Sequence, residues 1–238
     1  MKTIIEGFSI YSRNFYSILL LSFTITLPFL IIHNIISGSV YQIASITGAE
    51  FVADFTNLFF MLLLLVIVQV PFIQLVKSDI ELDEKPLRKA YGSFLNYGFT
   101  VFLFSLLFSV AVIFGLILLV VPGILVMVWF YLTPQIIIFE EKNIRGSLRV
   151  ARKMGGQHFF SLLAIILLTS LIDVCAGYVG LFAISALTNS YLAIISGQML
   201  INMIVFPFNV IVVSLFASKW KKELETSSTV VTSNRYLA

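Results

Sequence analysis

Residues 98–140 read GFTVFLFSLLFSVAVIFGLILLVVPGILVMVWFYLTPQIIIFE, and no charged side chain occurs in them before Glu140. A membrane-spanning helix needs about 20 predominantly apolar residues, so this run is long enough for two. Pro122 and Gly123 divide it, and proline followed by glycine suits the two central positions of a type II turn. The stretch therefore predicts two antiparallel membrane spans joined by a tight turn at 121–123.

The remainder of the chain is equally apolar. Apolar residues make up 59% of the 238 residues and charged residues 11%, whereas a soluble domain carries about 25% charged residues. The mean hydropathy is +1.03. We expect an all-α membrane protein whose single domain, 1–220, contains six transmembrane helices and is followed by a cytoplasmic tail, 221–238, mobile from 223 onward. The six spans are predicted at about 15–36, 56–76, 98–120, 122–140, 159–185 and 191–218.

The basic residues predict how the chain is threaded. All 15 Lys and Arg residues lie before the first span or after the second, fourth and sixth, and the connections around 37–54, 121–123 and 186–190 contain none. Basic connections stay on the cytoplasmic side during insertion, so both termini are predicted to be cytoplasmic. This topology also accounts for the net charge of +3, and no nucleic-acid partner is expected.

The N-terminal segment has some features of a signal peptide, namely Arg13 followed by an apolar run. The run is about 22 residues long, whereas the apolar region of a signal peptide has 7–15. We therefore expect an uncleaved first span.

Each span that returns to the cytoplasmic side carries a proline: Pro71, Pro134 and Pro207. This recurrence is consistent with three related hairpins. The alternative is chance, because apolar sequences align easily and the spacing between the prolines is unequal. A proline inside a helix removes one hydrogen bond, so the three positions are predicted helix kinks.

Short segments of mixed polarity precede the ingoing spans and are predicted as interfacial helices at 141–157, 86–97 and 3–12. In 141–157 the apolar residues fall on one stripe, while Arg145, Arg149, Arg152 and Lys153 occupy another face, as expected of a helix lying in the membrane interface. Glu140 and Glu141 are expected to pair with this basic helix. The four cations are either topology anchors or a docking surface for anionic lipid or a partner protein.

Asp173 is the acidic residue placed well inside a span, and ionisable residues at that depth are costly and usually have a partner. No Lys or Arg lies in any predicted span, so an intramembrane salt bridge is excluded. His33 is one possible partner; a Ser, a Thr or a backbone carbonyl bonded to the protonated acid is another. Either a structural role or a role in handling a proton or substrate would fit.

A carboxamide lies near each proline: Gln69 near Pro71, Gln135 after Pro134 and Asn209 after Pro207. Two interpretations remain open. The amides could satisfy backbone groups that the prolines free, or, if the kinks face one another, they could line a polar cavity like those of transporters with interrupted helices.

Signals for catalysis are poor. The sequence has no paired carboxylates, no metal-ligand cluster, no nucleophile elbow and no glycine-rich phosphate loop. We expect no enzyme activity, no metal and no cofactor, and any ATP-binding subunit would be a separate chain.

Part of the chain resembles a multi-pass bacterial family of inner-membrane proteins without known function, whose module also forms the membrane portion of some glycerophosphodiester phosphodiesterases. The resemblance implies a helical module of the bacterial plasma membrane. It implies no hydrolysis, because the soluble phosphodiesterase domain is missing. The residues that carry it are Val121-Pro122-Gly123-Ile124 through Pro134, Ile138 to Glu141, Ile144 to Lys153 and Phe159.

The leading hypothesis is therefore a non-enzymatic accessory or scaffold protein of the bacterial cell membrane that binds lipid or a partner membrane protein. The alternative is a small transporter or permease subunit for an amphiphilic substrate. In that case Asp173, His33 and the three carboxamides would line its path.

Overall fold

A computed structural model describes residues 2–236, with side chains described up to residue 226. The described chain is helical throughout, and six of its helical segments are long and apolar enough to cross a membrane. This confirms the predicted all-α fold with six spans. These segments are Phe15–Thr47, Glu50–Ile80, Pro86–Leu118, Val120–Glu140, Phe159–Ser185 and Tyr191–Thr226.

The first span is built from three consecutive pieces that follow the short helix α1 (Lys2–Arg13). They are α2 (Phe15–Leu21), a π-helical turn η1 (Ser22–Thr26) and α3 (Leu27–Thr47). A left-handed residue, Gly48, turns the chain into α4 (Glu50–Ile80). The connection expected around 37–54 is shorter than predicted: it consists of the turn at Gly48 and Ala49, because both helices extend into the predicted range.

The second hairpin consists of α5 (Pro86–Leu118), α6 (Val120–Phe130) and α7 (Thr133–Glu140). The separate interfacial helix predicted at 86–97 is instead the first part of α5. The predicted type II turn is also misplaced: the chain reverses at the extended residue Leu119, and Pro122 and Gly123 lie in the first turn of α6. Proline suits a first helical turn, where its missing N–H costs little.

The last three helices are α8 (Ile144–Gln157), α9 (Phe159–Ser185) and α10 (Tyr191–Tyr236). The helices predicted at 141–157 and 3–12 are present as α8 and α1, and their position in the membrane interface stays a prediction. The segment predicted as a mobile tail, 223–238, continues the helical backbone of α10 to Tyr236. Residues 237 and 238 lie outside the described part.

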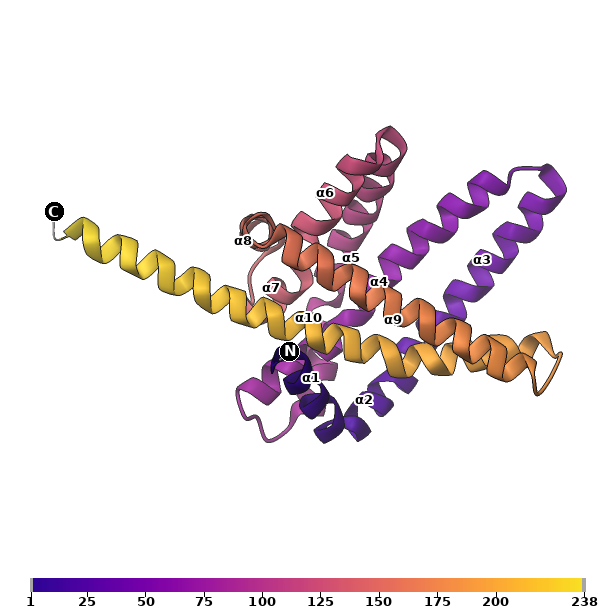
Figure 1. Cartoon of the computed structure of the whole chain (residues 1–238), viewed down its shortest axis with the longest axis horizontal. Coiled ribbons are helices and arrows are strands. Elements are labelled where there is room, and N and C mark those ends of the chain that lie inside the picture. The colour runs from indigo at the N-terminus through magenta and orange to yellow at the C-terminus, as the bar shows by residue number, and fades with distance from the viewer. Residues whose placement is uncertain (1, 237–238) are drawn as a thin grey trace.

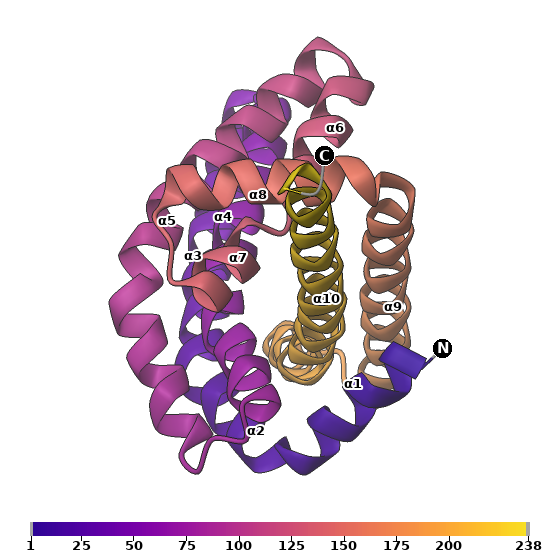
Figure 2. The ribbon, with the colours of Figure 1, turned by 90° about the vertical axis from the view of Figure 1, so that its left-hand side faces the viewer.

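The three hairpins α3–α4, α5–α6 and α9–α10 extend from a shared centre and diverge towards their tips (Figure 1). Helix α8 lies across the bundle, roughly perpendicular to α9 and α10 (Figure 2). We call the end that holds α1, α8 and the α4–α5 connection the basic end.

The hydrophobic core lies towards the basic end, around the second half of α4. Phe72 and Ile73 of α4, Leu21 of α2, Ile137 of α7 and Ile211 of α10 are each completely buried in it. The share of buried residues in the most apolar stretch is 67% for α4 and 17% for α9. Helix α4 is thus the central span, and α9 lies at the edge of the bundle.

Candidate functional site

The three predicted kink prolines are all buried, but they occupy different helical contexts. Pro71 and Pro207 lie inside the continuous helices α4 and α10. Pro134 instead follows a break in its span, at the start of α7. The hydroxyl of Thr133 donates to the carbonyl of Phe130, 2.7 Å away, which is the carbonyl that Pro134 leaves without its helical partner.

The carbonyl that Pro207 frees belongs to Met203, four residues earlier in α10. The hydroxyl of Ser22, on the π-helical turn of the first span, donates to it at 2.9 Å. One residue on, the carbonyl of Ile204 accepts a 3.0 Å bond from the Tyr11 hydroxyl of α1. The N-terminal elements therefore satisfy the kink in α10, and Asn209 does not, contrary to one interpretation of the sequence.

The amides of Gln69 and Gln135 meet between α4 and α7, and both side chains are buried. The Gln135 nitrogen donates to the Gln69 oxygen at 3.1 Å. If the Gln135 amide is turned over, its nitrogen lies 3.2 Å from the carbonyls of Tyr131 and Leu132, at the break between α6 and α7. The two amides thus bond to each other, or, with the Gln135 amide turned over, Gln135 bonds to the interrupted backbone, which is one of the two roles that the sequence left open.

Asp173 is paired with Asn209, and not with His33. The Asn209 amide nitrogen donates to a carboxylate oxygen of Asp173 at 2.8 Å, and it also lies 3.5 Å from the carbonyl of Thr169. His33 lies on α3, and its Nδ1 has no hydrogen-bond partner among the described residues. The partner of Asp173 is therefore an amide, which is not among the partners considered from the sequence, and His33 is not bonded to it.

Asp173 lies 14 residues after Phe159 in the 27-residue helix α9, so it is at mid-length of this helix. Two hollows on the described residues lie away from the three prolines, so neither is the predicted polar cavity between the kinks. One hollow adjoins α8 and the other lies between α3 and the start of α10.

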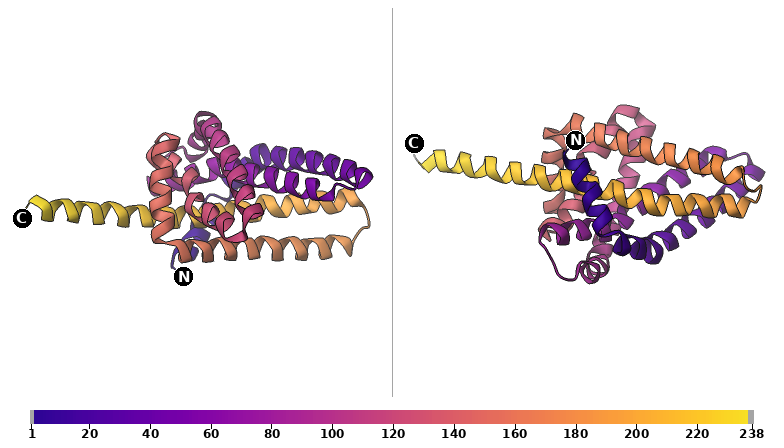
Figure 3. Two further views of the ribbon diagram at one scale, coloured as in Figure 1. Left: turned by 90° about the horizontal axis from the view of Figure 1, so that it is seen from above. Right: turned by 60° about the horizontal axis from the view of Figure 1, so that its bottom comes forward.

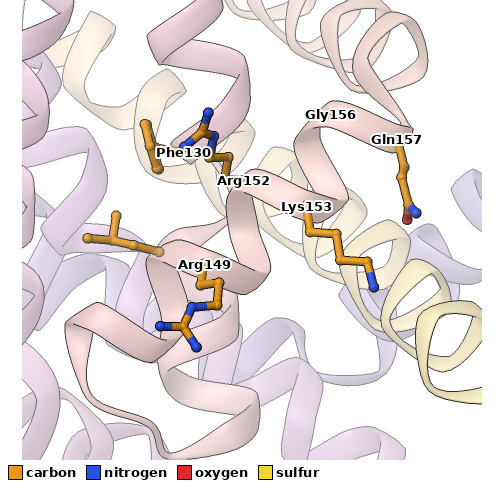
Figure 4. Close-up of a pocket in the computed structure, with 7 residues that line it drawn as sticks. Phe130, Arg149, Arg152, Lys153, Gly156 and Gln157 are labelled. Carbon is orange, nitrogen blue, oxygen red and sulfur yellow. The ribbon is translucent and has the colours of Figure 1, made fainter. Parts of the chain in front are cut away.

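The hollow beside α8 has a volume of about 700 Å³ and is lined by residues from α6 and α8. Phe130 and Leu148 supply its apolar part, and Arg149, Arg152 and Lys153 its charges (Figure 4). The Arg152 guanidinium also lies over the ring of Trp129, 5.4 Å from its centroid, within the range of a cation–π contact.

The opposite side of α8 packs against the bundle. Ser147, Ala151, Met154 and Gly155 are buried, whereas all four predicted docking residues, Arg145, Arg149, Arg152 and Lys153, are exposed. Gly155 permits this packing, since a Cβ there would lie 2.9 Å from the Trp129 Cα and the Val128 carbonyl oxygen. This close approach of Gly155 to α6 fixes α8 with its small and apolar side against the bundle and its four cations exposed.

Six other cations at the basic end have acidic partners, whereas Lys2, Lys85, Arg88 and Lys222 form no ion pair among the described residues. The ion pairs are Arg13–Asp79, Lys77–Glu141, Lys89–Asp83, Lys219–Glu6, and Lys142 and Lys221 with Glu140. Among the residues that the structure describes, none of the four cations of α8 forms an ion pair. Of the two glutamates expected to pair with the basic segment 141–157, Glu140 pairs with Lys142 of that segment, whereas Glu141 pairs with Lys77 of α4. Neither glutamate pairs with the four cations of α8.

The fold therefore defines an α-helical, multi-pass membrane protein with six spans and an amphipathic helix lying across its basic end. No family model, no curated protein and no solved structure matches the chain. The resemblance to the bacterial inner-membrane family stays a prediction.

Proposed function

We propose that this chain is an accessory protein of a bacterial plasma membrane whose basic end faces the cytoplasm and binds anionic lipid headgroups through α8. The observation that carries the proposal is that Arg149, Arg152 and Lys153 line one hollow and form no ion pair among the described residues. The orientation follows from the positive-inside rule, since the basic connections meet at this end.

The chemistry of the hollow suits a phospholipid headgroup. Arginine binds phosphate through two parallel N–H bonds, and lysine adds a compact positive charge. Each Lys or Arg near an anionic membrane surface contributes about 1 kcal/mol of attraction. Phe130 and Leu148 offer apolar contact to the glycerol and upper acyl region beside that phosphate.

The ion pairs elsewhere at the basic end support a scaffold role, because Lys77–Glu141 and Lys221–Glu140 tie the connection before α8 to the spans α4 and α10, and the cations of α8 stay free for a ligand. The transporter alternative has less support. Gln69 and Gln135 satisfy each other, and His33 does not join Asp173.

The experiment uses the full chain in phosphatidylcholine nanodiscs, with Trp220→Phe leaving Trp129 as the sole tryptophan donor. Energy transfer to a dansyl-labelled phosphatidylglycerol is titrated against the same label on phosphatidylcholine. We expect preferential transfer to phosphatidylglycerol. Changing Arg145, Arg149, Arg152 and Lys153 to Gln should weaken this binding by about a hundredfold or more, at about 1 kcal/mol per charge.

The matched control changes four other exposed cations to Gln, so the net charge falls equally. These are Lys2, Lys85, Arg88 and Lys222. The control should retain most of the preference for phosphatidylglycerol. An equal loss in both variants, or no preference in the parent protein, would refute a site on α8.

A further inference from the structure

The second site concerns Asp173, a carboxylate at mid-length of the least buried span. Its hydrogen bond with Asn209 uses the amide nitrogen of that residue. The Asn209 side chain is 7% exposed, and its Oδ1 is buried without a hydrogen-bond partner among the described residues. The pair therefore contains two acceptor groups and a single donor group, so it is short of donors.

This shortage is not met by a cation from the same chain. Lys and Arg residues are absent from the central parts of all six spans and occur at their basic ends. An intramembrane carboxylate normally pairs with a cation, takes up a proton or faces water, because isolated charge is costly in hydrocarbon. Neutralising the Asp173 carboxylate thus requires a proton or a cation from outside the chain.

The surroundings of Asp173 favour a helix as the source of that cation. The inward stripe of α9 is buried at Leu162, Ile166 and Thr169, and then becomes half-buried at Asp173. Helices α6 and α9 diverge towards the tips of their hairpins (Figure 1). Val174, which lies next to this stripe on the surface of α9, is exposed. An apolar helix face with one polar group is typical of contacts between membrane helices.

We propose that α9 docks a transmembrane helix of another membrane protein that carries a Lys or Arg at mid-membrane depth. The ammonium or guanidinium group of that helix would donate to the free acceptor positions of the Asp173 carboxylate. Asn209 acts as a positioning residue, because its amide holds the carboxylate between α9 and α10.

The test uses the full-length protein in phosphatidylcholine vesicles with labelled leucine-rich transmembrane peptides. One peptide carries a central Lys, a second carries Leu there, and a third carries the Lys two turns nearer its end. Association is measured by energy transfer between donor-labelled protein and acceptor-labelled peptide. The central-Lys peptide should bind about tenfold more tightly than the other two.

Asp173→Asn should abolish this preference while keeping the shape of the side chain, and Asp173→Glu should restore part of it. Asp54→Asn, at the start of α4 and far from the basic end, should leave the preference for the central-Lys peptide unchanged. Equal binding of the Lys and Leu peptides by the unmodified protein would overturn the proposal, as would a Lys preference that survives Asp173→Asn. The α8 variant with four Gln residues should still prefer the Lys peptide, so this test is independent of the lipid site.

Discussion

At the scale of single residues, hydroxyl groups satisfy the backbone carbonyls that two of the three prolines, Pro134 and Pro207, leave without a helical donor. Pro207 leaves the Met203 carbonyl without a helical donor, and Ser22 supplies one from the first span. Ser22 begins a π-helical turn, and single π-helical turns inside α-helices are frequently found at functional sites. The first and last spans are thus joined by a bond that neither helix could form alone.

We expect Ser22→Ala to destabilise the protein by about 1 kcal/mol, the order measured for polar contacts between membrane helices. In a Pro207→Ala background the Met203 carbonyl regains its helical donor, so the same change should cost clearly less. A double-mutant cycle on thermal unfolding in detergent measures the difference. Ser39→Ala is the control, because Ser39 donates within its own exposed turn. Additive effects of the Ser22 and Pro207 changes would show that the two residues are uncoupled.

At the scale of elements, the position of α8 depends on one glycine. Gly155 faces the backbone of α6, whereas no atom lies within 4 Å of a Cβ built on its neighbour Gly156. The two adjacent positions therefore share a helix and differ in what their side chains would meet.

This contrast gives a matched pair of variants. Gly155→Ala should destabilise the protein by about 1–3 kcal/mol, as overpacking against immovable backbone does. Gly156→Ala should be neutral or stabilising by up to about 1 kcal/mol, because alanine favours helix. Thermal unfolding of both variants checks the prediction. Equal effects at the two positions would mean that α8 does not pack closely on α6.

Amphipathic helices were predictable because their pattern is local. In α8 the basic and apolar residues separate at helical spacing, and the structure places them accordingly. The helix at 86–97 was wrongly separated from the following span because polarity changes there without any break in helical backbone. Leucine is not a residue type that signals a turn, so the sequence does not indicate the reversal at Leu119. The turn is instead predicted at the nearby Pro122-Gly123, whose residue types are typical of turns.

The partners of Asp173 and Met203 could not be predicted in the same way. Asn209 is 36 residues from Asp173, and Ser22 is 181 residues from Met203. Periodicity reports which face of its own helix a residue occupies, but not which helix lies opposite. The order of the hairpins around α4 decides these pairs, and it depends on packing between spans.

At the scale of the whole molecule, ion pairs connect the elements of the basic end. Lys219 and Glu6 join α10 to α1, Arg13 and Asp79 join α1 to α4, and Lys77 joins α4 to Glu141 after α7. The hairpin tips at the other end diverge (Figure 3). The basic end is therefore held by charge as well as by the core.

These charges predict a dependence of stability on pH. The hydrogen bond from Lys77, aided by its charge, lowers the pKa of Glu141, and the hydrogen bond from Lys89 lowers the pKa of Asp83. Because the folded carboxylates bind protons less tightly than the unfolded ones, their stabilisation is complete above the unfolded pKa values, about 4. It is lost as the pH falls through the lower folded values.

The unfolding temperature in detergent should therefore fall between pH 5 and pH 3, and the fall should be smaller in Glu141→Gln, which has no proton to gain. Glu50→Gln serves as the control, since Glu50 forms no ion pair in the described part of the chain. Both exposed pairs are screened by salt, so raising the ionic strength should also reduce the fall in the parent protein. If the parent and Glu141→Gln lose stability in parallel at low and high salt, acid acts elsewhere in the molecule, and the Lys77–Glu141 pair does not hold the basic end together.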